Sequence, residues 1–170
     1  MQSTESRRES LLRWGISAAF VLFGGPGIVG FYFPFTITRW HGATQSLWLR
    51  SAAIALICLG LLPLLESVIR FVRVGRGTLV PAMPTKVLVV SGFYRYVRNP
   101  MYVGMLTLIS GQAILFRSRS LVQYLVVVAL LFHLFVIGYE EPKLRRTYGE
   151  SYEEFCRHVP RWIPRRTPWG

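Results

Sequence analysis

The acidic residues are the first place to look for chemistry, because they are few and several adjoin apolar stretches. The 170 residues include no Asp and eight Glu, and Glu66, Glu140 and Glu141 lie near the ends of long apolar runs. Ionisable groups at membrane depth are costly and are therefore functional candidates. Adjacent helical side chains point about 100° apart, so we expect Glu140 to face inward while Glu141 pairs with Arg145. A solvated helix end explains this pair equally well, and for Glu66 a structural pair with Arg70 is favoured.

A second candidate is the run from Gly92 to Gly104, which packs aromatic and basic side chains just before an apolar stretch. Pro100 suits the first turn of a helix and Asn99 suits its N-cap, so part of the run is architecture. Capping does not explain the surplus of aromatic and basic residues, which are Tyr94, Arg95, Tyr96, Arg98 and Tyr102. The free N–H groups of that helix start would suit a carboxylate.

Lesser candidates lie further along the chain. His133 precedes the glutamate pair by about two helical turns, so it is either a base in the same pocket or a core histidine. Arg161 and Trp162 suit a substrate entrance or an interfacial anchor. Cys58 and Cys156 are expected to pack rather than to form a disulfide, and the cysteine and histidine spacing predicts no metal site.

The elements that position these residues are predicted to be membrane helices. With 52% hydrophobic and 16% charged residues, the chain is too apolar for an ordinary soluble domain. We expect four crossings, the first bent at Pro26 and the third rather short, because each apolar stretch approaches the roughly 20 residues that span a bilayer. The stretches are Trp14 to Phe35, Leu47 to Leu65, Met101 to Phe116, and Leu121 to Tyr139.

The net charge is +12, and the distribution of the basic residues agrees with the same topology. With four crossings, 16 of the 20 Lys and Arg residues fall on one side, which predicts cytoplasmic termini and a cytoplasmic site in an inner or plasma membrane. Anionic lipid attracts such a surface, so the charge indicates a membrane partner and no nucleic acid.

Two parts of different character are expected. Residues 1–70 form a scaffold hairpin of two helices, and residues 71–170 carry the candidate chemistry. Proline and glycine make residues 71–100 a structured loop, in which Lys86 to Val90 is expected to be extended. Residues 150–158 predict a short amphipathic helix at the interface, with Tyr152 and Phe155 on its apolar face.

These motifs resemble the isoprenylcysteine carboxyl methyltransferase and phospholipid methyltransferase family over about residues 75–164. The matching segments are Ser91 to Gly104, Glu140 to Leu144, Tyr148 to Tyr152, and Val159 to Pro164. The resemblance implies an all-α integral membrane enzyme that binds S-adenosylmethionine and releases S-adenosylhomocysteine. Gly75-Arg76-Gly77 lacks the third glycine of a dinucleotide fingerprint, which agrees with a cofactor site of another kind.

The resemblance also implies roles for individual residues. The implied cofactor-binding residues are Lys86, Val87, Leu88, Val89, Tyr94, Asn99, Pro100, Met101, Tyr102 and Glu140. The predicted catalytic residues are Arg98, Asn99 and Glu140, and the predicted substrate-binding residues are Arg95, His133, Arg161 and Trp162. The chemistry agrees, because a carboxylate can neutralise the cofactor's ammonium group and tyrosine faces attract a sulfonium.

Two positions depart from the family pattern. Asn99 stands where many members carry His, and an amide cannot act as a general base. Val136 stands where the prenylcysteine enzymes carry a substrate-binding Arg. The sequence therefore predicts methyl transfer to a lipophilic or membrane-delivered carboxylate, amine or thiol, leaving the acceptor and the oligomeric state open; the alternatives are a non-catalytic lipid-binding or scaffold protein and a small channel or carrier.

Overall fold

The structure is a computed structural model that describes residues 15, 25–41, 46–73, 88 and 90–170. These residues form helices, turns and loops, and no strand is found among them, as expected for an all-α protein. The helical segments are α2 (Gly25–Gly27), η1 (Ile28–Tyr32), α3 (Phe33–Thr38), α4 (Leu47–Arg73), η2 (Gly92–Arg95), α5 (Pro100–Leu115), α6 (Arg119–Phe135), η3 (Val136–Glu140), α7 (Glu141–Tyr148) and α8 (Glu150–His158).

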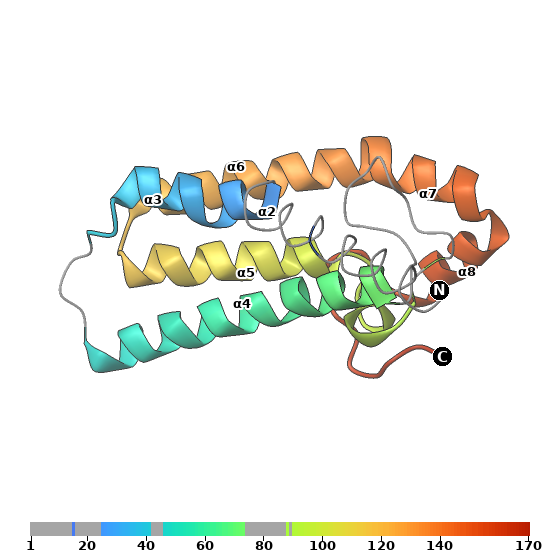
Figure 1. Cartoon of the computed structure of the whole chain (residues 1–170), viewed down its shortest axis with the longest axis horizontal. Helices are drawn as coiled ribbons and strands as arrows, with labels where there is room; N and C mark the ends of the chain where they lie inside the picture. The colour runs from blue at the N-terminus through green and yellow to red at the C-terminus, as the bar shows by residue number, and fades with distance from the viewer. Residues whose placement is uncertain (1–14, 16–24, 42–45, 74–87, 89) are drawn as a thin grey trace, which may run out of the picture.

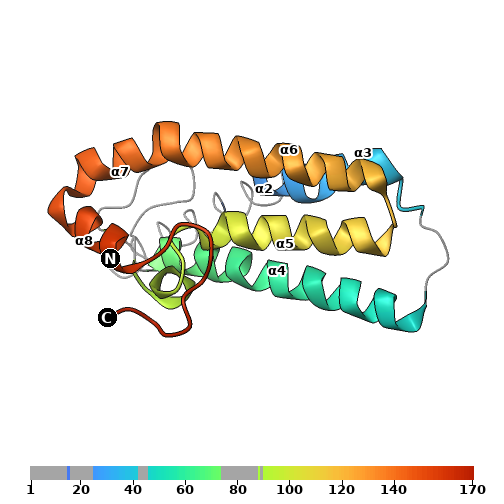
Figure 2. The same ribbon diagram turned by 180° about the vertical axis from the view of Figure 1, so that it is seen from behind.

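The long helices lie side by side along the molecule (Figures 1 and 2). Helices α4, α5 and α6 run in alternating directions, and α3 lies beside the first part of α6. Helix α6 continues through η3 into α7, and the chain then turns at Gly149 into α8. The start of α5, the ends of α4 and α7, and the C-terminal segment therefore meet at one end of the bundle, called the site end below.

Helices α4 and α5 pack closely because small residues face each other. A Cβ built on Gly60 would lie 2.6 Å from the carbonyl oxygen of Gly104, and a Cβ on Gly111 would lie 2.8 Å from the carbonyl oxygen of Ala53. Small residues that let two backbones approach are typical of helix packing in membranes, where apolar burial alone gives little driving force. This contact fixes the start of α5 against the end of α4.

The π turn η1 is held by polar side chains from two neighbouring helices. The Gln112 amide nitrogen donates to the Gly30 carbonyl at 2.8 Å, and the Tyr124 hydroxyl donates to the Val29 carbonyl at 2.8 Å. Wider π turns leave carbonyl groups less well paired in the helix, and here α5 and α6 supply partners. The first helical segment is thereby tied to both.

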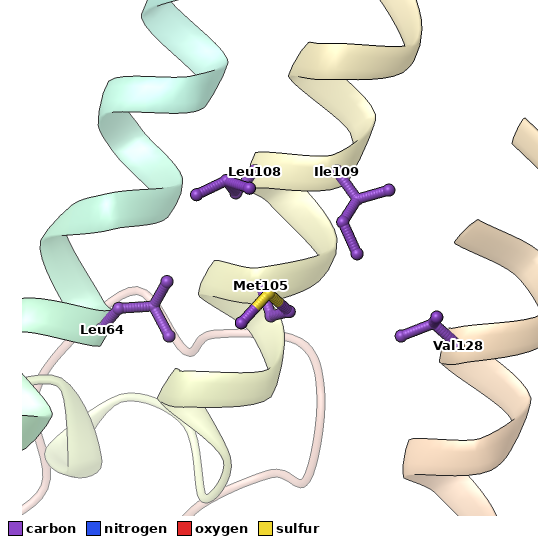
Figure 3. Close-up of a cluster of buried hydrophobic side chains, with 5 residues drawn as sticks. All are labelled: Leu64, Met105, Leu108, Ile109 and Val128. Atoms are coloured by element: carbon purple, nitrogen blue, oxygen red, sulfur yellow. The ribbon is translucent and has the colours of Figure 1, made fainter. Parts of the chain in front are cut away.

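The buried core lies along α5. Figure 3 shows Leu64 of α4 and Val128 of α6 on opposite sides of Met105, Leu108 and Ile109 of α5. Leu108 and Ile109 are fully buried. Helix α5 is thus the central helix of the bundle, which explains why apolar residues surround it.

The outer faces of the flanking helices are apolar and exposed. Five leucines on these faces are more than half exposed: Leu59 and Leu62 of α4 and Leu130, Leu131 and Leu134 of α6. Two stretches are long and apolar enough to cross a membrane, Leu47–Ser67 and Arg119–Tyr148, while Pro100–Leu115 is a shorter apolar helix. The second, third and fourth predicted apolar helices are confirmed. The first predicted stretch is described only at residue 15 and from Gly25 onward, and the number of crossings stays a prediction.

Helix boundaries differ from the predictions mainly at the site end. The second helix runs on to Arg73, and the fourth passes through the glutamate pair to Tyr148 instead of ending at Tyr139. Helix α8 forms at the predicted residues, but Tyr152 and Phe155 are buried against the protein, where Leu88, Val90 and Trp169 pack on them. The apolar face of α8 is therefore taken up by protein contacts.

Candidate active site

The centre of the site is a tyrosine and glutamate pair that joins two helices. The Tyr102 hydroxyl donates to Glu140 Oε2 at 2.8 Å, from the first turn of α5 to the end of η3. Both side chains are partly buried. A carboxylate that accepts from one hydroxyl has further acceptor positions, so Glu140 has room for a cationic group as well.

Tyr94, in η2, lies near this pair. Burial raises the pKa of Tyr94, and the neighbouring Ser67 hydroxyl partly offsets that increase. The carboxylates of Glu140 and Glu66 raise this pKa further, which places Tyr94 within electrostatic reach of both. Tyr94 therefore stays a neutral hydroxyl close to two glutamate side chains.

Glu66 stabilises the loop that carries Tyr94. Its Oε2 accepts a hydrogen bond from the Phe93 backbone N–H at 3.0 Å, so the end of α4 holds η2 in place. The predicted partner Arg70 has a side chain outside the described residues. Ser67, on the same helix end, is fully buried beside Tyr94 and was missed because a lone serine in an apolar helix gives no signal of function.

Aromatic rings cover the pair on the side of α6. The Tyr102 ring lies 4.6 Å from the Phe132 ring and 6.4 Å from the Trp162 ring, centroid to centroid. Trp162 Nε1 donates to His133 Nδ1 at 3.1 Å. His133 is exposed on α6, so the interpretation of it as a core histidine is wrong. The contact of Phe132 with Tyr102 was not predicted from the sequence, although Phe132 adjoins the candidate residue His133.

The role predicted for the Glu141 side chain is wrong. Instead of an exposed pair with Arg145, Glu141 is buried and binds Arg161 through two hydrogen bonds of 2.6 and 3.0 Å, with Arg98 at 3.1 Å. Arg145 pairs with Glu153 at the surface. The forked contact with Glu141 raises the pKa of Arg161, which stays charged. Arg98 and Arg161, predicted as catalytic and substrate-binding, are therefore bound to Glu141.

Asn99 occupies the predicted N-cap position, but its side chain does not cap the helix. Its Nδ2 donates to the carbonyl oxygen of Arg161 at 3.1 Å, and no side-chain cap bond is formed. Pro100 begins α5 as predicted and is fully buried. Met101 packs at the edge of the core cluster. The start of α5 is thus fixed by the C-terminal segment as well as by proline.

Arg95 binds the C-terminal segment. Its Nε donates to the Trp169 carbonyl at 2.8 Å, and a second guanidinium nitrogen donates to the Gly170 carbonyl. These residues line a cavity of about 550 Å³ with Val90, Ser91 and Tyr96. The predicted role of Arg95 in substrate binding stays a prediction.

The predicted cofactor loop is largely outside the described residues. Lys86, Val87 and Val89 fall there, and Leu88 packs on the aromatic side chains of α8. Cys58 and Cys156 are free thiols, and the Cys156 Sγ lies 3.0 Å from an Arg98 nitrogen. Over the described part of the chain, no group of three or more His, Cys, Asp or Glu residues is placed to hold a metal.

Taken together, the helices and the site define a helical membrane protein with a hydrogen-bonded tyrosine and glutamate pair and several aromatic rings at one end of its bundle. The family model described as phospholipid methyltransferase matches residues 48–151, which is more than half of the chain. The protein belongs to this family, which confirms the resemblance.

One curated relative indicates methyl transfer as well. The methanethiol S-methyltransferase of Crocosphaera subtropica (strain ATCC 51142 / BH68) is 35% identical over 78 residues, which cover 42% of this chain and 27% of that protein. The match thus spans only about a quarter of the relative's length. No solved structure shows significant similarity to the chain.

Proposed function

We propose that this protein transfers a methyl group from S-adenosylmethionine to a lipophilic or membrane-delivered small acceptor. The observation that carries the proposal is the Tyr102–Glu140 hydrogen bond, with Tyr94 beside it, at the site end of the bundle. Family membership supports methyl transfer in general. When bound, the cofactor supplies an electrophilic methyl group on a sulfonium.

The residues present fit that cofactor. Glu140 offers a carboxylate to its ammonium group, and the faces of Tyr94 and Tyr102 attract positive charge. Pro100 has no N–H, but the next N–H groups of α5 point out of the helix start, where a carboxylate is favoured. Tyr102 has a further role, because its hydrogen bond orients the Glu140 carboxylate.

The acceptor is proposed to lie on the side of Phe132 and Trp162, where the walls are aromatic. A thiolate or carboxylate acceptor requires alignment and exclusion of water more than a general base. The curated relative is named for a thiol acceptor, methanethiol, which makes small thiols part of the proposed range. Val136 is 1% exposed, so position 136 presents a buried apolar side chain where the prenylcysteine enzymes carry Arg.

The proposal includes the membrane arrangement. Four crossings place the termini and the site in the cytoplasm, with residues 1–70 as scaffold and residues 71–170 as the methyltransferase part. The exposed leucines of α4 and α6 support contact with lipid, because large exposed apolar faces are otherwise unfavourable.

Two measurements on detergent-purified protein test the function. Calorimetry with S-adenosylhomocysteine is expected to show binding to a single site. Transfer of a labelled methyl group is expected with at least one acceptor from a panel of thiols, fatty acids, aminophospholipids and prenylcysteines. Binding without transfer to any acceptor would favour the non-catalytic lipid-binding alternative, and absence of binding would refute the proposed cofactor.

A further inference from the structure

The segment that follows α8 is fixed at Pro160 and Arg161 by three separate contacts. The guanidinium of Arg161 forms a two-bond fork with Glu141, and the carbonyl oxygen of Arg161 accepts from the Asn99 amide at 3.1 Å. One residue earlier, the Pro160 carbonyl accepts from the backbone N–H of Arg98 at 2.9 Å. The side chain and the backbone of Arg161 are therefore both bound to the site end of the bundle.

Glu141 is the centre of this arrangement. Its side chain is 7% exposed and contacts guanidinium groups from two segments distant in sequence, Arg98 before α5 and Arg161 after α8. A buried carboxylate between two guanidinium groups holds all three side chains in place, because moving any one of them would leave a buried charge without its partner. Glu141 thus joins the helix that carries Glu140 to the segment that carries Trp162.

Trp162 lies between the candidate site and the outer face of α6. Its ring centroid lies 6.4 Å from that of Tyr102, with the two rings tilted by 60°. Its Nε1 donates to His133, which shares α6 with the exposed Leu130 and Leu134. An acceptor that arrives from lipid along this face meets the indole before it reaches Tyr102. The position of Trp162 therefore bears on the acceptor more than on the Glu140 side of the site.

We propose that Glu141 is a positioning residue, which acts through Arg161 to hold Trp162 as the wall of the acceptor side. This inference rests on the proposed function, because it assigns the Trp162 side of that same site to the acceptor. It separates the adjacent glutamates: Glu140 faces the cofactor, whereas Glu141 sets how tightly the acceptor is held.

The kinetic test uses Glu141→Gln, which removes the charge and keeps the size, with Glu153→Gln as the matched control in an exposed ion pair. Glu141→Gln is expected to raise the KM of the acceptor about tenfold or more, because small displacements of positioning groups have effects of this size. The same substitution should change the affinity for S-adenosylhomocysteine less than about threefold, because Glu141 is not proposed to contact that ligand. Arg161→Lys keeps the charge but loses the fork, and is expected to give an intermediate KM.

A double-mutant cycle tests whether Glu141 acts through Trp162. Trp162→Ala alone is expected to raise the acceptor KM, and adding Glu141→Gln should raise it little further, since the residue to be positioned is gone. Additive effects of the two substitutions would overturn the proposal.

A spectroscopic test needs no activity. In protein labelled with 5-fluorotryptophan, the Trp162 resonance is identified by its loss in Trp162→Phe. It is expected to shift or broaden in Glu141→Gln and in Arg161→Lys, and to stay unchanged in Glu153→Gln. An unchanged resonance in the first two variants would refute positioning. If the wild type bound no S-adenosylhomocysteine while the resonance responded as expected, the proposed function would fail and the structural link would stand.

Discussion

Tyr102 and Glu140 are 38 positions apart in sequence, and their side chains meet at 2.8 Å across the site end of the bundle. The contact connects the first turn of the central helix to the end of the π turn η3. It places one carboxylate among aromatic rings, where a cationic ligand can be bound without full exposure to water.

Glu140→Gln is expected to weaken binding of S-adenosylhomocysteine by about 10-fold to 100-fold, because a charge-assisted contact to an ammonium group contributes roughly 1.5–3 kcal/mol. Tyr102→Phe should have a smaller effect, since it removes the donor that orients the carboxylate but leaves the charge. Calorimetry measures both, with Glu153→Gln as the control for a Glu to Gln change at an exposed site. Equal affinity in Glu140→Gln and the wild type would show that the carboxylate does not face the cofactor.

Glu141→Gln is expected to destabilise the fold more than Glu153→Gln does. Loss of charge from a buried carboxylate bound to two guanidiniums costs about 3–5 kcal/mol, whereas an exposed pair contributes at most about 1 kcal/mol. Unfolding of the two variants in detergent, followed by circular dichroism against temperature, compares them directly. Equal unfolding temperatures would contradict the burial of the Glu141 network.

Gly60→Ala is expected to loosen the contact between α4 and α5. The new Cβ would lie 2.6 Å from backbone atoms of Gly104 and Leu108, which cannot move aside as a flexible side chain can. Overpacking of this kind costs roughly 1–3 kcal/mol. Gly138→Ala is the matched control, because a Cβ there meets nothing within 4 Å. An equal decrease of the unfolding temperature in both variants would argue against the close approach of the helices.

Reporters fused at the C-terminus and within residues 71–100 are both expected to read cytoplasmic. The reason is the distribution of basic residues, 16 of 20 of which fall on that side of a four-crossing chain. Alkaline phosphatase and green fluorescent protein fusions give opposite signals on the two sides. A periplasmic signal at either position would divide the proposed site across the bilayer.

A farnesylated cysteine analogue is expected to be a poor acceptor even when cofactor binding is normal. The buried Val136 stands where the prenylcysteine enzymes carry Arg, and a charge-assisted contact of that kind contributes about 1.5–3 kcal/mol. The labelled-methyl panel compares this analogue with small thiols. Efficient methylation of the prenylcysteine would refute the inference from Val136.

The helices were predicted well from the sequence because the signals for them, the length of an apolar run and the position of a proline, depend only on residues close together in the chain. Pro100 begins α5 as expected, while the cofactor roles of Tyr102 and Glu140 stay predictions from the family resemblance. The partner of Glu141 was predicted wrongly because the i+4 rule considers one helix, whereas Arg161 and Arg98 lie 20 and 43 positions away. Asn99 illustrates the same limit, since its amide binds a carbonyl 62 positions away instead of capping its own helix.

The π turn Val136–Glu140 makes the α6–α7 helix longer by one residue than a regular α-helix over the same path. The extra residue is taken up within the wider turn, so the residues beyond it keep nearly the faces that a regular helix would give them. Deleting Gly138 would remove the π turn and leave Glu140 directed to Tyr102 and Glu141 to Arg161. Deleting a residue from the regular part of α6 would instead rotate the glutamate pair by about 100°, because no turn is there to take up the change. Position 138, where a Cβ meets nothing within 4 Å, should therefore tolerate both a change of residue type and the loss of one residue.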